Sequence, residues 1–553
     1  MAKPLAVDLS HHLSQLALRR EQERLAGLFD PASPSPSLIS LDGGVPAPST
    51  FPFESVSIQY LAPDAFPIDP TRRPSSTFFG WLSTMFNHPK SLMKVTKVTR
   101  FALDPTKEFD IAQALSYSPF RGLVPLRKYV REFVAKIHQP SYADWDVIVD
   151  LGAGDALPKV LAVLAEPGDI CLVDAYTYNQ SLLQIRSVGI KPFGIQMDGG
   201  GINPADLERV LTTWDVKEMG SPRPRLLLQV PVGQNPTGST LTPERKRIIY
   251  EICAKWDIII IEDDPYHFLQ SGPYIRPDAR MNAYAAEVTD QDWLASLAGS
   301  FIRYDYEGRV IRLDTFSKVI GPGSRLGILT APKCLIQHLE NAQTGTSTAP
   351  SGLSQALIGT VLMQWGIDGF VRWQRGLRGI YRMRRDWVLD LLFEKFDIQE
   401  EFGNDGHLTY VGYAKGVTSP VRTKSSMVEY QGKEYGKVKP TQLLRFTPPA
   451  GGMFLWLEFD LSQHPEFASI AARPGNTLAS ARNILSHRLF TALVEHDVLL
   501  RPGHVFQVVP DDERDARGET TAYMRLAFST VEYPQLQMAI TNFVRAVSDF
   551  FCK

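Results

Sequence analysis

Residues 226–266 read LLLQVPVGQNPTGSTLTPERKRIIYEICAKWDIIIIEDDPY, and this stretch contains one complete strand–helix–strand unit. Two apolar runs, 226–230 and 258–261, enclose a helical segment that opens at Thr242-Pro243-Glu244. Proline suits the first helical position because the N–H that it lacks would have no partner there. The apolar runs are continuous rather than alternating, which is typical of strands buried on both faces. The stretch therefore predicts part of a parallel sheet flanked by helices.

The same pattern continues on both sides of this unit. Further strands are predicted at 146–151, 170–173, 310–313 and 326–329, with a helix at 126–138 and a long helical region at 353–395. Residues 396–553 alternate shorter strands and helices, whereas residues 40–90, rich in Pro, Ser and Phe, give no clear prediction. We therefore predict an α/β fold with a large domain, built on a mostly parallel sheet flanked by helices, and a smaller α/β C-terminal domain.

The predicted domain boundaries follow from these patterns. Residues 1–38 form an N-terminal arm, in which a polar helix is followed by the proline-rich segment 30–36. The large domain spans 39–395 and carries an insertion at 271–308, and the small domain spans 396–553 and carries a basic loop at 415–440. We interpret this basic loop as a solvated surface segment rather than a nucleic-acid site.

Composition excludes several classes of protein. The chain has 553 residues, with 58 basic and 60 acidic side chains and a net charge of -2, which argues against an electrostatic nucleic-acid binder. The 10% of aromatic residues favours a packed core over disorder. The four cysteines are widely spaced and form no C-x-x-C pair, so we expect no disulfide framework, no metal site and a reducing compartment.

Targeting signals are also weak. There is no run of 18 apolar residues to span a membrane, and the N-terminus lacks an apolar secretory segment. Arg19, Arg20 and Arg24 would suit a transit peptide, but Asp8 and nearby glutamates do not. We expect a cytoplasmic protein, with the mitochondrion as the alternative.

A lysine follows one predicted strand at the place where parallel sheets form their active sites. Asp314-Thr315-Phe316-Ser317-Lys318 comes directly after the strand at 310–313, and Arg325 follows seven residues later. An amine flanked by two hydroxyls can act as a nucleophile beside a phosphate. Taken alone, the Ser-x-Lys pattern also suits an ordinary surface lysine.

Three other strand ends carry polar or small residues. The run of isoleucines ends in Glu262-Asp263-Asp264-Pro265-Tyr266, where one aspartate could hold a protonated ring nitrogen and the other could cap a helix. The strand at 226–230 ends in a Gln-Asn-Pro-Thr-Gly string around Asn235, which is more than a plain Asn-Pro turn. Gly152-Ala153-Gly154 precedes a helix, and small residues there let backbone N–H groups approach a phosphate. The third glycine of a dinucleotide fingerprint is missing.

Together these motifs resemble the fold type I, pyridoxal 5′-phosphate-dependent aminotransferases. The strings at 234–238, 262–266, 315–318 and 323–327 occur in the order and at the spacing of that family, apart from the 271–308 insertion. The segments 39–46 and 307–314 resemble the branch that contains kynurenine/α-aminoadipate and fungal aromatic amino-acid aminotransferases. The resemblance covers about residues 40–535.

The resemblance implies roles for the cofactor-site residues. Lys318 would bind pyridoxal phosphate covalently and later move the substrate's proton, and Asp263 would pair with the ring nitrogen. Tyr178 would stack on the ring, with Tyr176 as its competitor. Asn235 and Tyr266 would hold the ring's 3-oxygen. The phosphate would be held by Thr315, Ser317, Arg325 and backbone N–H groups near Asp155 and Ala156. The carboxylate of Asp155 would repel a phosphate unless it turned away, so only its backbone role is inferred.

The resemblance also implies how substrate is bound. Arg525 would hold the substrate's α-carboxylate through its planar fork, assisted by Asn235 and Gly44. Tyr117 would reach the phosphate of a second subunit, which implies a homodimer.

The implied reaction is pyridoxal-phosphate-dependent transamination of an aromatic L-amino acid (phenylalanine, tyrosine, tryptophan or kynurenine) with a 2-oxo acid, 2-oxoglutarate being the expected acceptor. The alternatives are 2-aminoadipate as donor, or a β-lyase or decarboxylase reaction with the same residues. A cofactor-sensing regulator would need a DNA-binding module, for which the first ~40 residues are too short and too rich in proline.

Overall fold

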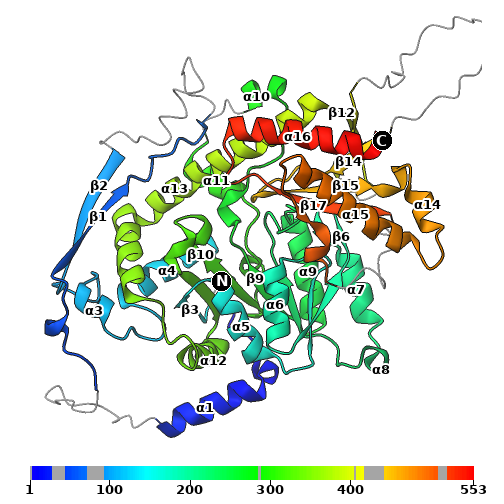
Figure 1. The fold of residues 1–553 in the computed structure, drawn as a ribbon. Helices are drawn as coiled ribbons and strands as arrows, with labels where there is room; N and C mark the ends of the chain where they lie inside the picture. Colours follow the sequence, from blue (N-terminus) through cyan, green and yellow to red (C-terminus); the bar gives the residue numbers. More distant parts are fainter. Residues whose placement is uncertain are drawn as a thin grey trace, which may run out of the picture.

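The computed structural model describes residues 3–27, 44–70, 92–283, 288–403, 406–415, 441–508 and 520–552. Two large sheets dominate the fold (Figure 1). The strands of the first sheet are, in spatial order, β3 (Trp145–Asp150), β11 (Gly327–Pro332), β10 (Val310–Thr315), β9 (Ile259–Asp263), β8 (Leu226–Gln229), β4 (Ile170–Asp174) and β5 (Lys191–Ile195). Strand β11 is antiparallel to both of its neighbours, β3 and β10. All the remaining pairs of neighbouring strands in this sheet are parallel. The predicted mostly parallel sheet is confirmed.

The first sheet is buried on both faces, as its continuous apolar strands predict. Successive side chains of a strand point to opposite faces. Accordingly Ile258 and Ile260 belong to one apolar cluster, and Ile259 and Ile261 belong to another. The first face is covered by α4 (Val124–Ile137), α7 (Pro204–Thr212), α9 (Pro243–Lys255) and the first part of α13 (Gly352–Lys395), and the second by α5 (Ala153–Leu164), α6 (Asn179–Ser187) and α12 (Lys333–Thr344).

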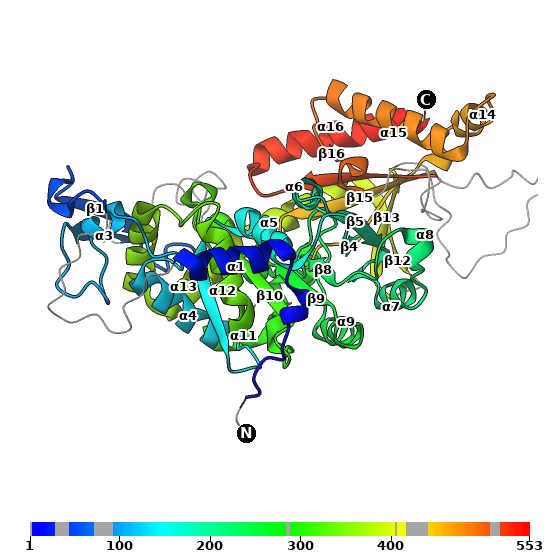
Figure 2. The ribbon, with the colours of Figure 1, turned by 90° about the horizontal axis from the view of Figure 1, so that it is seen from below.

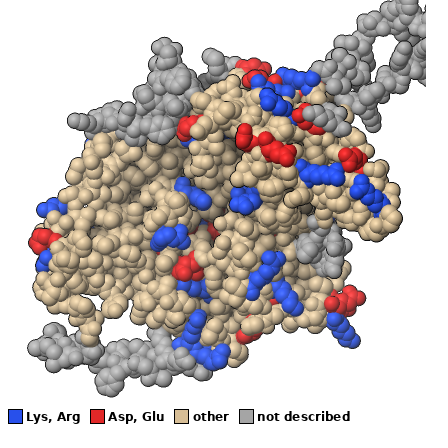
Figure 3. Space-filling view, viewed as in Figure 1, with Lys and Arg blue, Asp and Glu red and all other residues tan. Residues whose placement is uncertain are grey.

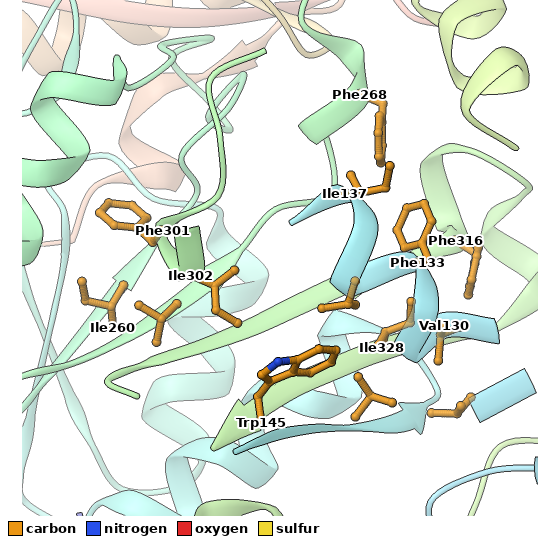
Figure 4. Packing of buried hydrophobic residues seen from close by; sticks show 14 of the residues in the cluster. Val130, Phe133, Ile137, Trp145, Ile260, Phe268, Phe301, Ile302, Phe316 and Ile328 are labelled. Carbon is orange, nitrogen blue, oxygen red and sulfur yellow. The ribbon is translucent and has the colours of Figure 1, made fainter. Parts of the chain in front are cut away.

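The cluster on the first face contains several aromatic rings (Figure 4). Phe133 of α4 lies 6.0 Å from Phe268 between ring centroids, and Trp145 packs with Ile328 in the same cluster. The 271–308 segment contributes to this core as well. Its helix α11 (Asp290–Ser296) buries Trp293, and α10 (Pro277–Ala283) precedes it. Helix α11 therefore packs into the core of the first face, whereas Tyr274 packs against the cluster of the second sheet.

The N-terminal arm lies along the large sheet's second face (Figure 2). Helix α1 (Gln15–Gly27) packs on α12 and α5, and Leu9 is fully buried. Asp257 joins the arm to the body, because its carboxylate contacts His11 at 2.7 Å, His12 at 3.2 Å and Arg309 at 2.6 Å. The arm is therefore an integral layer of the fold over residues 3–21, whose side chains the structure describes.

The second sheet is antiparallel throughout. Its strands are, in spatial order, β12 (Phe396–Phe402), β13 (Leu408–Ala414), β14 (Gln442–Phe446), β15 (Phe454–Asp460), β17 (Thr521–Ala527) and β16 (Arg501–Pro502). One face packs on α15 (Leu478–Glu495), α16 (Tyr533–Cys552) and the last turns of α13. Because residues 388–392 of α13 join this cluster, one helix enters the cores of both halves.

A two-stranded hairpin, β1 (Ser55–Leu61) and β2 (Met93–Thr99), projects from the edge of the molecule (Figures 1 and 2). Neither this hairpin nor β5 was predicted. Residues 28–38 of the arm, 39–43 of the family-like segment, 284–287 and 416–440 of the basic loop lie outside the described residues.

Neither sign of charge dominates the face of the molecule that Figure 3 shows. Basic and acidic side chains are interspersed over the face in Figure 3. None of the helices in the described part of the chain has both the length and the apolar character needed to cross a bilayer.

Candidate active site

A carboxylate with one inaccessible oxygen ends strand β9. Oδ1 of Asp263 is inaccessible to solvent and has no hydrogen-bond partner among the described residues. Burial, followed by the negative charges of Asp264 and Asp314, raises the pKa of Asp263 to about 7. A buried acid without a partner costs stability, and such groups are concentrated at functional sites.

The neighbouring aspartate has a different environment. Asp264 accepts hydrogen bonds from Arg312 and His267, both at 3.1 Å. Arg312 is itself fully buried and also donates to Asp314 at 2.7 Å. Asp264 therefore belongs to a structural ion network, and Asp263 is left to bind a ligand.

Lys318 lies close enough to Asp263 for their charges to interact. It ends the short 3-10 helix Phe316–Lys318 that follows β10. Burial lowers the pKa of the Lys318 amine, Asp263 opposes this shift, and Arg525 adds to it. A depressed pKa favours the neutral amine, which is the form that acts as nucleophile and as base.

Arg525 reaches the same site from strand β17 of the second sheet. Its Nη1 donates to Oδ1 of Asn235 at 2.6 Å, across the boundary between the two halves. The guanidinium also lies between two aromatic rings, with Cζ 4.5 Å from the ring centre of Phe454 and 4.8 Å from that of Phe506. Its Nε is buried without a partner among the described residues, so this donor is available to an anion.

Two glycines allow the halves to approach at this point. Gly233, with a φ of +53°, lies before Asn235, and a Cβ there would stand 2.4 Å from the Cα of Gly452. Gly452 in turn has a φ of +75° and precedes Phe454. Side chains at these positions would separate the backbones, so both glycines are required to bring Asn235 to Arg525.

Residues suited to a phosphate gather beside Lys318. A Cβ on Gly152 would stand 3.3 Å from Oγ1 of Thr315 and 3.7 Å from Nη2 of Arg325, so these groups surround the start of helix α5. The hydroxyl of Thr315 also donates to that of Ser317 at 2.9 Å. Hydroxyls, a guanidinium and a helix N-terminus form a favourable environment for an anion.

The backbone N–H groups of Asp155 and Ala156 are engaged. Both donate to the carbonyl of Gly152, at 2.8 and 3.1 Å. Ala153 and Gly154 precede them in the first turn, where helix N–H groups have no acceptor within the helix. The first-turn donors therefore begin two residues earlier than the pair that the sequence singled out.

The remaining predicted residues are distributed as follows. Tyr266 is buried, which raises its pKa, and its phenol interacts electrostatically with Asp263 and Arg525. Tyr178 is 39% exposed at the start of α6 and interacts with Arg525. Tyr117 is 80% exposed. Gly44 is exposed, and no atom lies within 4 Å of the place where its Cβ would stand.

Phe454 and Phe506 are site residues that sequence reasoning missed. The paired glycines before Phe454 were the available signal, because adjacent glycines often mark a close backbone approach. Phe506 is brought in by the bond from the N–H of Thr177 to its carbonyl, at 2.8 Å, which no short motif encodes.

These residues fit pyridoxal phosphate. The unpartnered carboxylate of Asp263 suits a protonated ring nitrogen, Lys318 suits the aldehyde, and the cluster around Gly152 suits the phosphate. Fold and site together define a pyridoxal-phosphate-dependent enzyme, and comparisons with known proteins identify its family.

The family model for class I and II aminotransferases matches residues 87–375. An aromatic amino acid aminotransferase of Schizosaccharomyces pombe is 30% identical over 547 residues, covering 98% of each chain. An L-tyrosine:2-oxoglutarate aminotransferase of Serpula lacrymans is 30% identical over 91% of this chain and 84% of its own. The mitochondrial kynurenine/alpha-aminoadipate aminotransferase of Mus musculus is 32% identical over 69% of this chain and 79% of its own.

A solved structure agrees with these relatives. The aminotransferase Aro8 of Candida albicans superposes with a TM-score of 0.79 at 28% identity, covering all of both chains. The chain belongs to the class I and II aminotransferase family. It is a pyridoxal-phosphate-dependent enzyme whose substrates are an amino acid and a 2-oxo acid.

The unpartnered Asp263 predicts a pH dependence of stability in the cofactor-free protein. The folded protein keeps this proton up to a pH of about 7, whereas the unfolded chain releases it near the ordinary value of 3.8. The folded state therefore binds more protons in this window, and stability falls as the pH rises through it. We expect the free energy of unfolding of Asp263→Asn to exceed that of the parent by roughly 2 kcal/mol at pH 5 and by roughly 4 kcal/mol at pH 8.

Thermal unfolding of both apoproteins across this range measures the difference. Pyridoxal phosphate should remove most of the pH dependence from the parent protein, because a positive ring nitrogen stabilises the ionised carboxylate. Parallel stability curves for the two apoproteins would show that Asp263 is not held in its protonated form.

Proposed function

We propose that the enzyme transaminates aromatic L-amino acids, with 2-oxoglutarate as the amino acceptor. The observation that carries this proposal is the setting of Arg525, a carboxylate-binding fork between Phe454 and Phe506 with two tyrosines, Tyr178 and Tyr266, close by. Aromatic walls next to a carboxylate clamp favour an aromatic side chain, because ring pairs add to the energy of burial. The printed names of the fungal relatives support the same substrate class.

The chain's own residues have separate tasks in this proposal. When bound, pyridoxal phosphate supplies an electron sink for the substrate's α-carbon. Arg525 holds the α-carboxylate and so fixes the direction of the Cα–H bond. Lys318 would carry out the 1,3-proton shift, removing the proton from Cα with its neutral amine, because burial lowers the pKa of this amine and favours its uncharged form.

Further residues hold the cofactor. Asp263 would keep the ring nitrogen protonated, Asn235 and Tyr266 would bind the ring's oxygen, and Tyr178 would stack on the ring. Thr315, Ser317, Arg325 and the first turn of α5 would bind the phosphate. Gly44 stays a prediction for the substrate side of the site.

2-Aminoadipate is the second candidate donor. The mouse relative carries this substrate in its printed name alongside kynurenine. A second carboxylate would need a cation beyond Arg525, and the nearby Arg501, which pairs with Arg525 in the register of β16 and β17, is a candidate.

A single-turnover donor panel tests the proposal. Holoenzyme is mixed with one amino acid at a time and no oxo acid, and the loss of the cofactor's visible absorbance reports conversion to its amino form. We expect phenylalanine, tyrosine, tryptophan and kynurenine to react at least about 10-fold faster than alanine at equal concentration. The variant Arg525→Lys should slow every donor by a similar factor, because it weakens the carboxylate clamp that they share.

Each other outcome identifies another activity. A fastest reaction with 2-aminoadipate would overturn the aromatic assignment in favour of the second candidate. Release of ammonia or carbon dioxide without conversion of the cofactor would identify a lyase or a decarboxylase.

We also propose a homodimer in which Tyr117 completes the partner's phosphate site. Its 80% exposure in a single chain supports this assignment. Four other large apolar side chains between residues 101 and 124 are also exposed, namely those of Phe101, Leu103, Phe120 and Val124. Exposed apolar surface of this kind is typical of an interface.

Mixed dimers of Tyr117→Ala and Lys318→Ala test this arrangement. If Tyr117 acts across the interface, one of the two sites in the mixed dimer receives an intact Tyr117 and an intact Lys318, so mixing the inactive variants should restore activity. If Tyr117 acts within its own subunit, both sites stay defective and mixing restores nothing. Sedimentation of the same samples reports the oligomeric state.

The division into an arm, a large domain and a small domain is part of the proposal. The separate apolar clusters of the two sheets support it. We also propose a cytoplasmic location, because the acidic residues Asp8, Glu21 and Glu23 of the arm do not suit a transit peptide. Cell fractionation distinguishes this from the mitochondrial alternative.

A further inference from the structure

The start of helix α5 carries a negative charge that is unfavourable for phosphate binding. Asp155 is the third residue of the helix, and its side chain is about one-third exposed. A helix N-terminus attracts anions, but a carboxylate in the first turn competes with a phosphate dianion for that field. Either the carboxylate is neutralised or cofactor binding is weakened.

Lys159 meets that carboxylate directly. It lies one turn later on the same face of α5, and its Nζ forms an ion pair with Oδ2 of Asp155. The same Nζ donates to Oδ2 of Asp150 at 2.8 Å and to Oγ of Ser347 at 2.8 Å. An ammonium has three donors, so these three acceptors satisfy it completely.

Ser347 completes the arrangement. Its Oγ donates to Oδ2 of Asp155 at 3.1 Å, so the carboxylate is held by both Lys159 and Ser347. Arg325, in contrast, donates to the carbonyl of Pro322 at 3.3 Å. The carboxylate of Asp155 is thus bound by its own network, and the guanidinium expected to bind the phosphate is not used to neutralise it.

The network is too deeply buried to be an ordinary surface ion pair. Lys159 is 5% exposed and Asp150, at the end of β3, is 1% exposed. An uncharged side chain at position 159 would therefore leave the carboxylates of Asp150 and Asp155 without a cation near the start of the helix. Exposed pairs contribute little, but removing one member of a buried network leaves its partners uncompensated.

We propose that Lys159 is a positioning residue for the cofactor's phosphate, which neutralises Asp155 and holds its carboxylate on Ser347. This inference rests on the proposed phosphate site around Gly152, Thr315 and Arg325. It explains how a helix that begins Ala-Gly-Asp can still bind a dianion. Lys159 itself does not touch the cofactor.

The test compares affinities for pyridoxal phosphate and for pyridoxal, which lacks the phosphate. Apoprotein prepared from full-length holoenzyme is titrated with each compound, and binding is followed by absorbance. Lys159→Met should lower the affinity for pyridoxal phosphate by about 10-fold and leave the affinity for pyridoxal nearly unchanged. Only the phosphate would be repelled by the carboxylate of Asp155 once its cation is removed. A general loss of structure would weaken both compounds equally.

Rescue is the sharper outcome. Adding Asp155→Asn to Lys159→Met should restore most of the lost affinity, although Asp155→Asn alone should change it less than about 2-fold, since that charge is already neutralised. Lys159→Arg should retain the preference for the phosphate compound. If Lys159→Met does not fold because Asp150 is left unpaired, the same comparison is made with Asp150→Asn present in every variant.

Lys255→Met is the control for loss of a paired lysine away from the site, because Lys255 forms an exposed ion pair with Glu208 on the helices that cover the opposite face of the sheet. This control should leave both affinities as they are. The proposal is overturned if Asp155→Asn fails to rescue, or if pyridoxal loses as much affinity as pyridoxal phosphate. Equal affinity of the parent protein for the two compounds would instead contradict the proposed phosphate site, and the role of Lys159 that rests on it.

Discussion

The unpartnered carboxylate of Asp263 is the constraint on which the rest of the site depends. Strand β9 lies in the middle of the sheet with its isoleucines fully buried, and at its end Oδ1 of Asp263 is inaccessible to solvent. Alternation along the chain sends Glu262 and Asp264 into a network with Arg312, and sends Asp263 toward Lys318. The fold therefore maintains an acid that it does not itself satisfy, and a positively charged ring nitrogen is the partner that would satisfy it.

The two halves of the chain contribute different parts of the site. The first sheet supplies Asp263, Lys318 and the turn at Gly152 for which we propose phosphate binding, whereas the second supplies Arg525 from β17. Contact between them depends on Gly233 and Gly452, whose backbones nearly touch. Asn235 of the first half already accepts a hydrogen bond from Arg525 of the second half. The half that would bind the cofactor therefore orients the guanidinium that would bind the substrate's carboxylate.

Much of this arrangement could be predicted from the sequence. Continuous apolar runs identified six of the seven strands of the large sheet, and the polar residues after them gave the candidate site residues, whose roles stay predictions. Strand β5 was missed because Pro192 and Gly194 interrupt its pattern, which an edge strand tolerates. The β1–β2 hairpin was missed because β1 is mostly half-buried and β2 mostly exposed, so the two strands bury few apolar side chains.

The missed parts of the site share one physical cause. Phe454, Phe506 and Lys159 act through contacts between segments far apart in the chain or through a buried network, and neither is encoded in a short motif. The sequence singled out the N–H groups of Asp155 and Ala156 for the predicted phosphate site, whereas the structure shows that both donate to the carbonyl of Gly152. Sequence motifs thus indicate where a site lies, whereas the structure is needed to tell which backbone N–H groups are free to bind a ligand.

The most direct test of the account is to locate the covalent attachment of the cofactor. Holoenzyme is reduced with borohydride, digested, and its peptides are weighed by mass spectrometry. The account predicts that the added pyridoxyl phosphate mass is found on Lys318 alone. Attachment to any other lysine, such as the buried Lys159 or Lys246, or no attachment at all, would contradict the pairing of Lys318 with Asp263 as the centre of the site.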